Sequence, residues 1–395
     1  MTKVLITADR VITKPADPAI EDGAVLVDGE AILAVGSAAE LDAVADASVT
    51  RLRCPGATVM PGLIDGHVHL AFDASEDPVR AVAQASRDEL AGAMRARAER
   101  MLATGVTTVR DLGDRDALTV ELRTAIASGA AVGPRILAAT TPLTSRGGHC
   151  GFLGGEVATD DEVRSQIARN VAAGADLIKV MASGGALTPT GPRMWERQFP
   201  PDRLKLIVDE AARYGLGVAA HAHGTDVIAD CVAAGVRTVE HCSWRTVDGI
   251  SHDPRTSRAI AEKGIFVCRC ISGDWKSFLG RLGEERAKAM TETVLRMRED
   301  GVRFLAGTDA GVPGARFDDY VGTLEFFAGV GFSPREVLEM ATVNPAEALG
   351  SRSTGALGPG MSADLIVTDG NPLTDLGALR KIRHVFAAGR RSAAS

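Results

Sequence analysis

Eight short apolar runs that alternate with longer helical stretches limit the fold of this chain more than any other feature. Two of the stretches, 86–105 and 284–301, are typical of helices that end at a glycine. Eight strand and helix units of this kind predict an α/β protein built on a closed (β/α)8 TIM barrel. The runs begin near Val59, Thr107, Arg135, Asp176, Gly217, Thr238, Ile265 and Val302.

The two ends of the chain share a different pattern. Residues 3–36 and 355–389 consist of short β runs separated by Gly, Pro, Asn and Asp-Gly turns. Because isolated hairpins are only marginally stable, we expect the two ends to complete one unit. The sequence therefore predicts a composite β-sandwich domain from residues 1–57 and 355–395, and the barrel from residues 58–354.

Composition narrows the class of partner. The 395 residues carry a net charge of −7 and no long Lys/Arg run, so we expect a small-molecule substrate and no nucleic acid. The first ten residues lack the apolar block of a signal peptide, and no apolar run is long enough for a membrane span, which predicts a cytoplasmic protein. Six scattered cysteines argue against a disulfide framework and for a reducing compartment. Homo-oligomerisation is left open.

Polar residues stand at the ends of several apolar runs. His67 and His69 in PGLIDGHVHL are two residues apart on a strand, so both imidazoles can reach one ion, although an incidental pair is an equal alternative. His221 and His223 in GVAAHAHGTD share a face in the same way. Lys179 in DLIKVMASGG lies in a run expected to be covered on both faces, where an unpaired ammonium would cost several kcal/mol. A surface position therefore fits this lysine poorly.

Three further histidine or aspartate positions have both a structural and a functional interpretation, and one pair of cysteines has a structural one. His241 in TVEHCSW, taken alone, is most simply a satisfied polar residue, and Asp309 in LAGTDAG is a turn residue or a metal ligand and proton acceptor. His149 in SRGGHCGFLGG is either a loop histidine or a group that contacts substrate. The Cys268 and Cys270 pair in FVCRC is interpreted as small buried hydrophobic residues.

The stretch PGLIDGHVHL resembles the first-strand signature of the amidohydrolase superfamily, and the later motifs follow in the order that family uses. The resemblance spans nearly the whole chain. It implies two divalent cations, with Lys179 carboxylated by CO2 to bridge them, and it favours His221 over His223 as a ligand. The GGH motif resembles prolidase-like and imidazolonepropionase-like members, which implies that His149 hydrogen-bonds the substrate carbonyl. The implied metal ligands are His67, His69, Lys179, His221, His241 and Asp309, and the implied catalytic or substrate-contacting residues are Asp309, His149 and His223.

This ligand set suits amide hydrolysis. A water that bridges two divalent cations has a pKa near neutrality, so a hydroxide is available to attack a carbonyl. Asp309 would take the proton of that water and pass it to the leaving amine. Imidazole and carboxylate donors favour zinc. The sequence thus predicts a metal-dependent hydrolase that cleaves the C–N bond of a small amide, such as a dipeptide or an N-acyl amino acid, with a substrate-facing loop at residues 185–201.

Three alternatives stay open at this point. A one-metal deaminase, or a ring-opening hydrolase similar to imidazolonepropionase, usually has a glutamate soon after the fifth-strand histidine and lacks the lysine, whereas HAHGTD has no glutamate and Lys179 is present. Lactone or phosphotriester hydrolysis uses an equivalent two-metal core. A metal-free scaffold barrel is disfavoured because all six ligand positions are filled.

Overall fold

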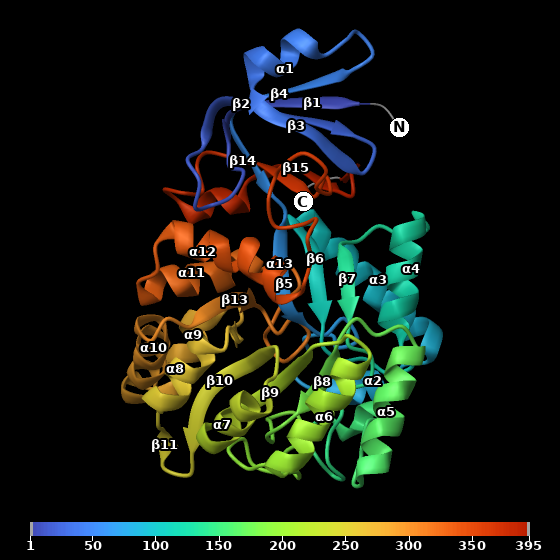
Figure 1. Cartoon of the computed structure of the whole chain (residues 1–395), viewed down its shortest axis with the longest axis vertical. Coiled ribbons are helices and arrows are strands. Elements are labelled where there is room, and N and C mark those ends of the chain that lie inside the picture. Colours follow the sequence, from blue (N-terminus) through green and yellow to red (C-terminus); the bar gives the residue numbers. More distant parts are fainter. Residues whose placement is uncertain (1–2, 393–395) are drawn as a thin grey trace.

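The computed structural model describes residues 3–392, and eight parallel strands form its larger part (Figure 1). They pair as two sheets, in the order β5-β6-β7 and β8-β9-β10-β12-β13. Single parallel bridges join the sheets, from Val68 to Ala310 and from Leu143 to Val180. The order around these strands is that of a TIM-barrel type fold, and the predicted parallel pairing is confirmed. The strands are β5 Leu63–Val68, β6 Val106–Asp111, β7 Arg135–Ala138, β8 Ile178–Met181, β9 Val218–Gly224, β10 Thr238–Thr246, β12 Phe266–Cys270 and β13 Arg303–Gly307, with β11 Gly249–Ile250 paired to β10.

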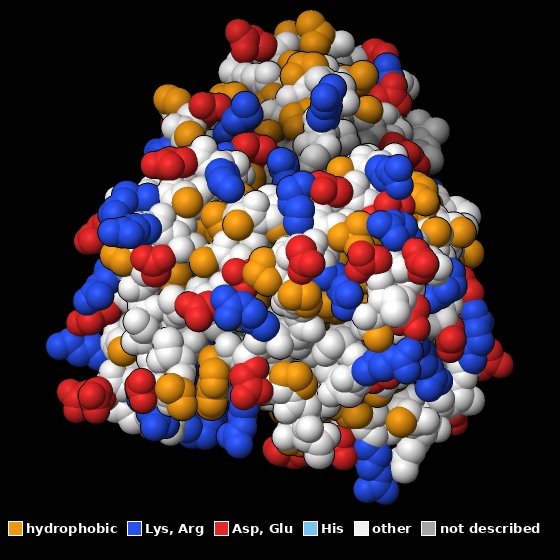
Figure 2. Space-filling model, turned by 60° about the horizontal axis from the view of Figure 1, so that its bottom comes forward, with side chains coloured by type: hydrophobic (Ala, Val, Ile, Leu, Met, Phe, Trp, Pro, Cys, Tyr) orange, Lys and Arg blue, Asp and Glu red, His pale blue; other side chains and the backbone are white. Residues whose placement is uncertain are grey.

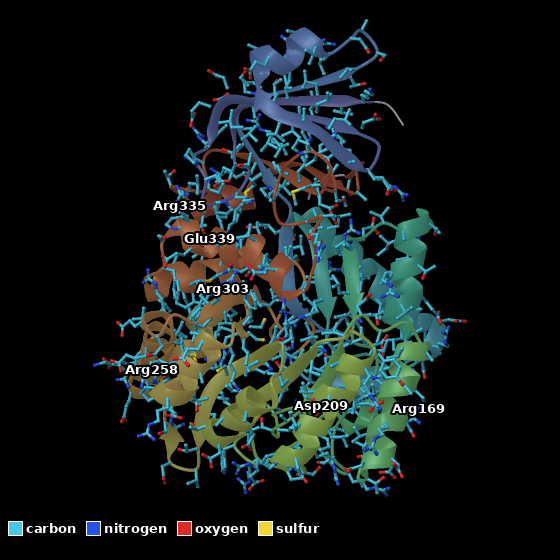
Figure 3. All side chains as sticks on the ribbon, viewed as in Figure 1. Arg169, Asp209, Arg258, Arg303, Arg335 and Glu339 are labelled. Atoms are coloured by element: carbon cyan, nitrogen blue, oxygen red, sulfur yellow. The ribbon has the colours of Figure 1, made fainter. Side chains whose placement is uncertain are left out.

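Helices follow most of these strands and present charged side chains outward. Arg169, Asp209 and Arg258 are examples, on α5, α6 and α8 respectively (Figure 3). The two helices expected from the sequence are confirmed as α3 and α10, and α3 begins with a capping box between Ser86 and Glu89. The helices are α2 Pro78–Gln84, α3 Arg87–Ala103, α4 Leu118–Ser128, α5 Asp160–Ala172, α6 Pro201–Arg213, α7 Thr225–Ala234, α8 Pro254–Glu262, α9 Trp275–Leu282, α10 Glu284–Glu299, α11 Tyr320–Val330, α12 Pro334–Met340 and α13 Val343–Ala348.

Both chain ends contribute to one seven-stranded sheet, at the top of Figure 1. Its order is β16-β15-β14-β4-β1-β2-β3, so β4 is flanked by a strand from each end of the chain. The sharing of one unit by the two ends agrees with the sequence pattern, whereas the sandwich architecture and the domain boundaries stay predictions. Helix α1, Ala38–Val44, was not expected. The strands are β1 Val4–Val11, β2 Ile20–Asp28, β3 Ala31–Ser37, β4 Thr50–Pro61, β14 Leu365–Asp369, β15 Ile382–Ala387 and β16 Arg390–Ser392.

The first predicted run, near Val59, divides into two strands. β4 ends at Pro61 in the terminal sheet, and β5 begins at Leu63 among the parallel strands. Between them, a Cβ atom on Gly62 would lie 2.1 Å from the Oγ1 of Thr107 on β6. The chain therefore passes from one sheet to the other at a residue that has no room for a side chain.

The remaining general expectations concern cysteines, membranes and surface charge. All six cysteines are free and buried, which agrees with the absence of a disulfide framework. Across residues 3–392, no helix has both the length and the apolar composition of a membrane span. On the face seen in Figure 2, acidic and basic side chains are interspersed, with apolar atoms in small groups among them.

Candidate metal centre

Six of the eight histidines gather where the parallel strands end. His67 and His69 lie at the carboxyl end of β5. The other four histidines come from β9, β10 and the loop after β7. Ring centroids are 4.7 Å apart for His149 and His221, 4.6 Å for His221 and His241, and 5.2 Å for His241 and His67. All six side chains are buried. The fold thus brings together histidines that are separated by up to about 170 residues in the sequence.

One set of donor atoms consists of His67, His69 and Asp309. The Nε2 atoms of the two histidines are 3.3 Å apart, and each lies 3.4 Å from Oδ1 of Asp309. Burial raises the pKa of Asp309, but the charge of His67 and a hydrogen bond from His69 outweigh it and lower that pKa to about 2. The carboxylate is therefore ionised and converges with two imidazoles on one point.

A second set consists of His221, His223 and His241, whose donor atoms lie within 4.8 Å of one another. Nε2 of His221 is 3.1 Å from the carbonyl oxygen of Gly184, so an N–H there can donate and leave Nδ1 free to bind a cation. Nδ1 of His223 lies 2.7 Å from the hydroxyl of Ser243. Burial holds the pKa of all three histidines well below its ordinary value, so the rings are neutral. Since His221 and His223 are both in the set, the choice between them stays a prediction.

Lys179 on β8 is fully buried, and its Nζ has no hydrogen-bond partner among the described residues. Burial lowers the pKa of this amine. Besides burial, its charge lowers the pKa of His69 in the first set and of His221 in the second, so the amine interacts electrostatically with both sets. A neutral buried amine is the form that can add CO2, and the carbamate product would supply an anionic donor, which the second set lacks.

His149 lies beside these groups on the loop after β7. Its backbone N–H donates to Oε1 of Gln198 at 2.7 Å, and a Cβ on Gly185 would lie 2.4 Å from its Nε2. Its Nδ1 is buried without a partner within the described chain. Burial, with the charge of Lys179, lowers the pKa of His149 to about 3, so the ring is neutral. Because Gly185 and Gln198 both belong to the predicted loop 185–201, that loop packs against this histidine.

Two buried charged residues of the site were missed from the sequence. Glu240 on β10 has an oxygen 2.9 Å from Nδ1 of His67, and Arg110 on β6 binds both oxygens of Glu240 at 2.9 Å. Both were detectable by the argument applied to Lys179, because each is a charged residue inside an apolar run, TTVRD or TVEH.

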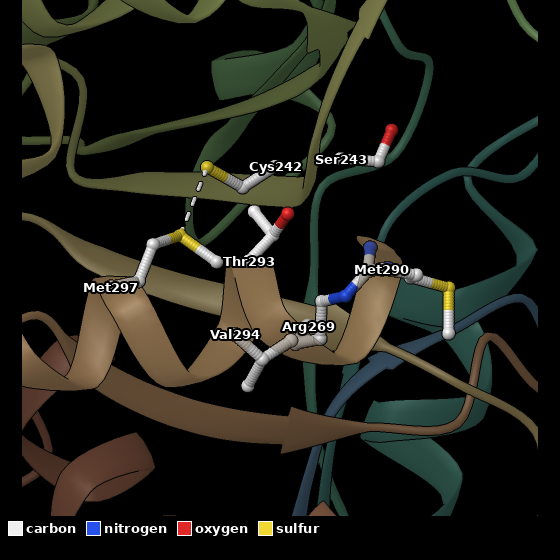
Figure 4. A pocket seen from close by; sticks show the side chains of 7 residues that line it. All are labelled: Cys242, Ser243, Arg269, Met290, Thr293, Val294 and Met297. Atoms are coloured by element: carbon white, nitrogen blue, oxygen red, sulfur yellow. Dashed lines mark hydrogen bonds between the residues drawn. The ribbon is translucent and has the colours of Figure 1, made fainter. Parts of the chain in front are cut away.

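A narrow pocket lies beside the end of β10, against helix α10 (Figure 4). His241 has a left-handed backbone conformation, with φ of 64°, and its carbonyl oxygen accepts a 2.7 Å hydrogen bond from Arg269 of this pocket. Ser243, which also lines the pocket, contacts His223. Two pocket residues, Arg269 and Ser243, therefore hold His241 and His223 of the second set in place. The lining residues are Cys242, Ser243, Arg269, Met290, Thr293, Val294 and Met297.

Comparison with known proteins assigns most of the chain to one family. The sequence model of the Amidohydrolase family matches residues 58–391. Ochratoxinase from Aspergillus niger is 28% identical over 98% of this chain and 86% of its own length. A solved prolidase complexed with N-methylphosphonate-L-proline has a TM-score of 0.86 and 28% identity, and covers 100% of both chains. A solved Xaa-Pro dipeptidase with bound methionine has a TM-score of 0.84 and 26% identity, and covers 99% of this chain and 100% of its own.

Proposed function

This chain belongs to the amidohydrolase family and is a hydrolase of C–N bonds, and on that premise we propose that its substrate is a small linear amide, either a dipeptide or an N-acyl amino acid. The relatives named as a prolidase, an Xaa-Pro dipeptidase and an ochratoxinase support an amide substrate. The observation that carries the proposal is the amine of Lys179, which is buried without a hydrogen-bond partner among the described residues and whose charge acts on both histidine sets.

The donors present fit two divalent cations. His67, His69 and Asp309 would hold one, His221 and His241 the other, and a carboxylated Lys179 would be shared. Zinc suits imidazole and carboxylate donors. Such cations supply Lewis acidity, which activates water and polarises the scissile carbonyl. The carbamate would convert an orphaned buried amine into a charged group with partners, which is the physical reason for the modification.

The residues of this chain can perform the proton transfers of amide hydrolysis. Asp309 is ionised at neutral pH, so it can accept a proton from the attacking water and deliver it to the leaving nitrogen. His149 is neutral and has an unpartnered Nδ1, so an N–H at that atom can donate to the carbonyl oxygen as negative charge develops there. We assign His223 a contact with the substrate, and the 2.7 Å contact between its Nδ1 and the hydroxyl of Ser243 would fix the orientation of the ring.

A substrate panel tests the proposal. Enzyme loaded with zinc in bicarbonate buffer would be assayed for amine release from Xaa-Pro dipeptides, other dipeptides and N-acyl amino acids, together with a lactone and an organophosphate triester. We expect hydrolysis of at least one amide class. Turnover of the lactone or the triester with no activity on any amide would overturn the proposal.

Metal content separates the proposal from its rivals. We expect two zinc ions per chain by elemental analysis and loss of activity in Lys179→Ala. One metal per chain, with a fully active Lys179→Ala variant, would favour the deaminase or ring-opening alternative. Protein that purifies without metal and shows no thermal shift with zinc would favour a scaffold.

A further inference from the structure

The interior of the parallel strands contains a charged chain of contacts that the hydrolytic mechanism does not use. It runs from Arg110 on β6 through Glu240 on β10 to His67 on β5, and all three side chains are at most 1% exposed. Arg110 contacts both oxygens of Glu240 at 2.9 Å and also donates to the carbonyl of Gly66 at 2.6 Å and the hydroxyl of Thr238 at 2.8 Å. The guanidinium is thus held by β5, β6 and β10 together.

The carboxylate of Glu240 acts as a hydrogen-bond acceptor toward every side chain that contacts it here. Its oxygens accept from Arg110, from the hydroxyl of Thr238 and from the ring of His67 at 2.9 Å. Arg110 lies 2.9 Å from both oxygens, which is the geometry of a charge-assisted pair between a guanidinium and an ionised carboxylate. An ionised carboxylate accepts only, so Nδ1 of His67 must carry the proton.

We propose that Glu240, fixed by Arg110, is the positioning residue of the metal centre: it holds His67 in the Nδ1–H tautomer and aims the lone pair of Nε2 at His69 and Asp309. Nε2 lies 3.3 Å from His69 and 3.4 Å from Asp309, on the side of the ring away from Glu240. The inference rests on the proposed function, since it assigns His67 as a ligand. A hydrogen bond to the far nitrogen also raises the basicity of a ligating imidazole.

A second reading of the same region is a soft-metal site. Cys268 and Cys270 lie beside His67 and Glu240, with Sγ of Cys270 at 3.0 Å from Nδ1 of His67 and at 4.0 Å from the other sulfur. A cation there would need the lone pair of Nδ1 and an oxygen of Glu240 that Arg110 already occupies. The thiols are therefore neighbours of the hydrogen bond, which agrees with their interpretation as small buried residues.

The tautomer of His67 can be read directly. With only eight histidines, ¹⁵N-histidine labelling gives a tractable spectrum in which long-range couplings separate Nδ1–H from Nε2–H rings. Burial lowers the pKa of His67, but the charges of Cys270 and Asp309 raise it to about 9, so the metal-free spectra are recorded at about pH 10, where the ring is mainly neutral. There we expect the neutral ring of His67 to be predominantly Nδ1–H in the wild type and mixed in Glu240→Gln. An unchanged tautomer in Glu240→Gln would overturn the proposal. Because this readout needs no metal, it stands even if the proposed function fails.

Metal affinity is the second readout. Competition with a chromophoric chelator should show zinc binding weakened about 10- to 100-fold in Glu240→Gln. Because that variant leaves Arg110 unpaired, Arg110→Gln/Glu240→Gln is made as well: we expect its melting temperature to recover while its affinity stays low. If affinity follows the melting temperature across the variants, the carboxylate has only a structural role and the proposal is wrong.

Asp65 supplies the matched control. It is also a buried carboxylate against His67, but it accepts from the backbone N–H at 3.1 Å and from Thr308, not from the ring. Asp65→Asn should therefore leave the His67 tautomer unchanged. For the thiols, Cys268→Ser/Cys270→Ser should retain the wild-type zinc content, and the loss of one equivalent would establish the soft-metal reading instead.

Discussion

Lys179 is an unusual residue because its amine is buried and yet makes no hydrogen bond in the part of the metal-free chain that the structure describes. Its Nζ is enclosed without a partner within residues 3–392, so the folded chain bears the cost of removing an amine from water. Replacing it with methionine keeps the length and removes the polar atom. We expect Lys179→Met to raise the free energy of unfolding of metal-free protein by about 1 to 3 kcal/mol while abolishing activity.

Urea denaturation in the presence of a chelator measures this prediction. Lys205→Met is the matched control, because Lys205 is exposed and pairs with Asp209 on the surface of α6. We expect the control to change stability by less than about 0.5 kcal/mol. A metal-free Lys179→Met that is less stable than wild type would mean that the amine has a partner in solution.

His149 gives a prediction about catalysis. If its N–H bonds the carbonyl oxygen, His149→Asn should lower kcat/KM by about 10²- to 10³-fold while metal content stays unchanged. The measurement is steady-state kinetics on the best amide of the panel. If the variant keeps the kcat/KM of the wild type, His149 has no catalytic role and is only a loop residue.

The same residue predicts a pH effect on stability. The pKa of His149 is about 3 in the fold and 6.5 when unperturbed, so below pH 6.5 the unfolded chain binds a proton that the native chain does not. Stability is therefore lost as pH falls from about 6.5 to about 3, by at most about 1.4 kcal/mol per pH unit for this one site. Unfolding of metal-free protein at pH 7 and pH 5 should show a shallower loss in His149→Asn. Equal losses in the two proteins would contradict the lowered pKa.

At the scale of strands, glycines inside the parallel strands set how closely the chain can pack around His67. A Cβ on Gly307 of β13 would lie 2.6 Å from Sγ of Cys268 and 2.8 Å from Cβ of His67. We expect Gly307→Ala to destabilise the protein by about 1 to 3 kcal/mol and to weaken zinc binding. Gly92, exposed within α3 with open space around it, is the control, and Gly92→Ala should stabilise by up to about 1 kcal/mol. Thermal melts and zinc titrations compare the two, and wild-type zinc affinity in Gly307→Ala would contradict the close approach.

Elements and site differ in how far the sequence predicts them. Apolar runs and helical spacers predict the parallel strands, because their periodicity is local. The division of the first run at Gly62 was not predictable, since it depends on Thr107, a residue of another strand. Lys179 was predictable as a buried amine from its run alone. The partners of Glu240 were not, because Arg110 and His67 approach it from strands far away in the sequence.

For the whole molecule, the proposed ligands come from β5, β8, β9, β10 and β13 or the residues that follow them. Metal binding should therefore oppose global unfolding. At zinc concentrations 100 times Kd, each site should add about 2.7 kcal/mol, so a chelator should lower the melting temperature by several degrees. Differential scanning fluorimetry measures the shift, and a His67→Ala/His221→Ala variant should be insensitive to chelator. A wild type equally insensitive would contradict a metal that bridges these strands.

The position of β4 between strands of both chain ends has a consequence for synthesis on the ribosome. β4 pairs with β1 soon after both emerge, but its other edge waits for β14, about 300 residues later. Throughout that interval the nascent chain exposes a strand edge that can pair with a neighbouring copy. The strands at the end of the chain therefore cover a strand edge that has been exposed since the beginning of translation. Stalled chains that end before β14 should need chaperone protection, even when the residues of the metal centre have already emerged.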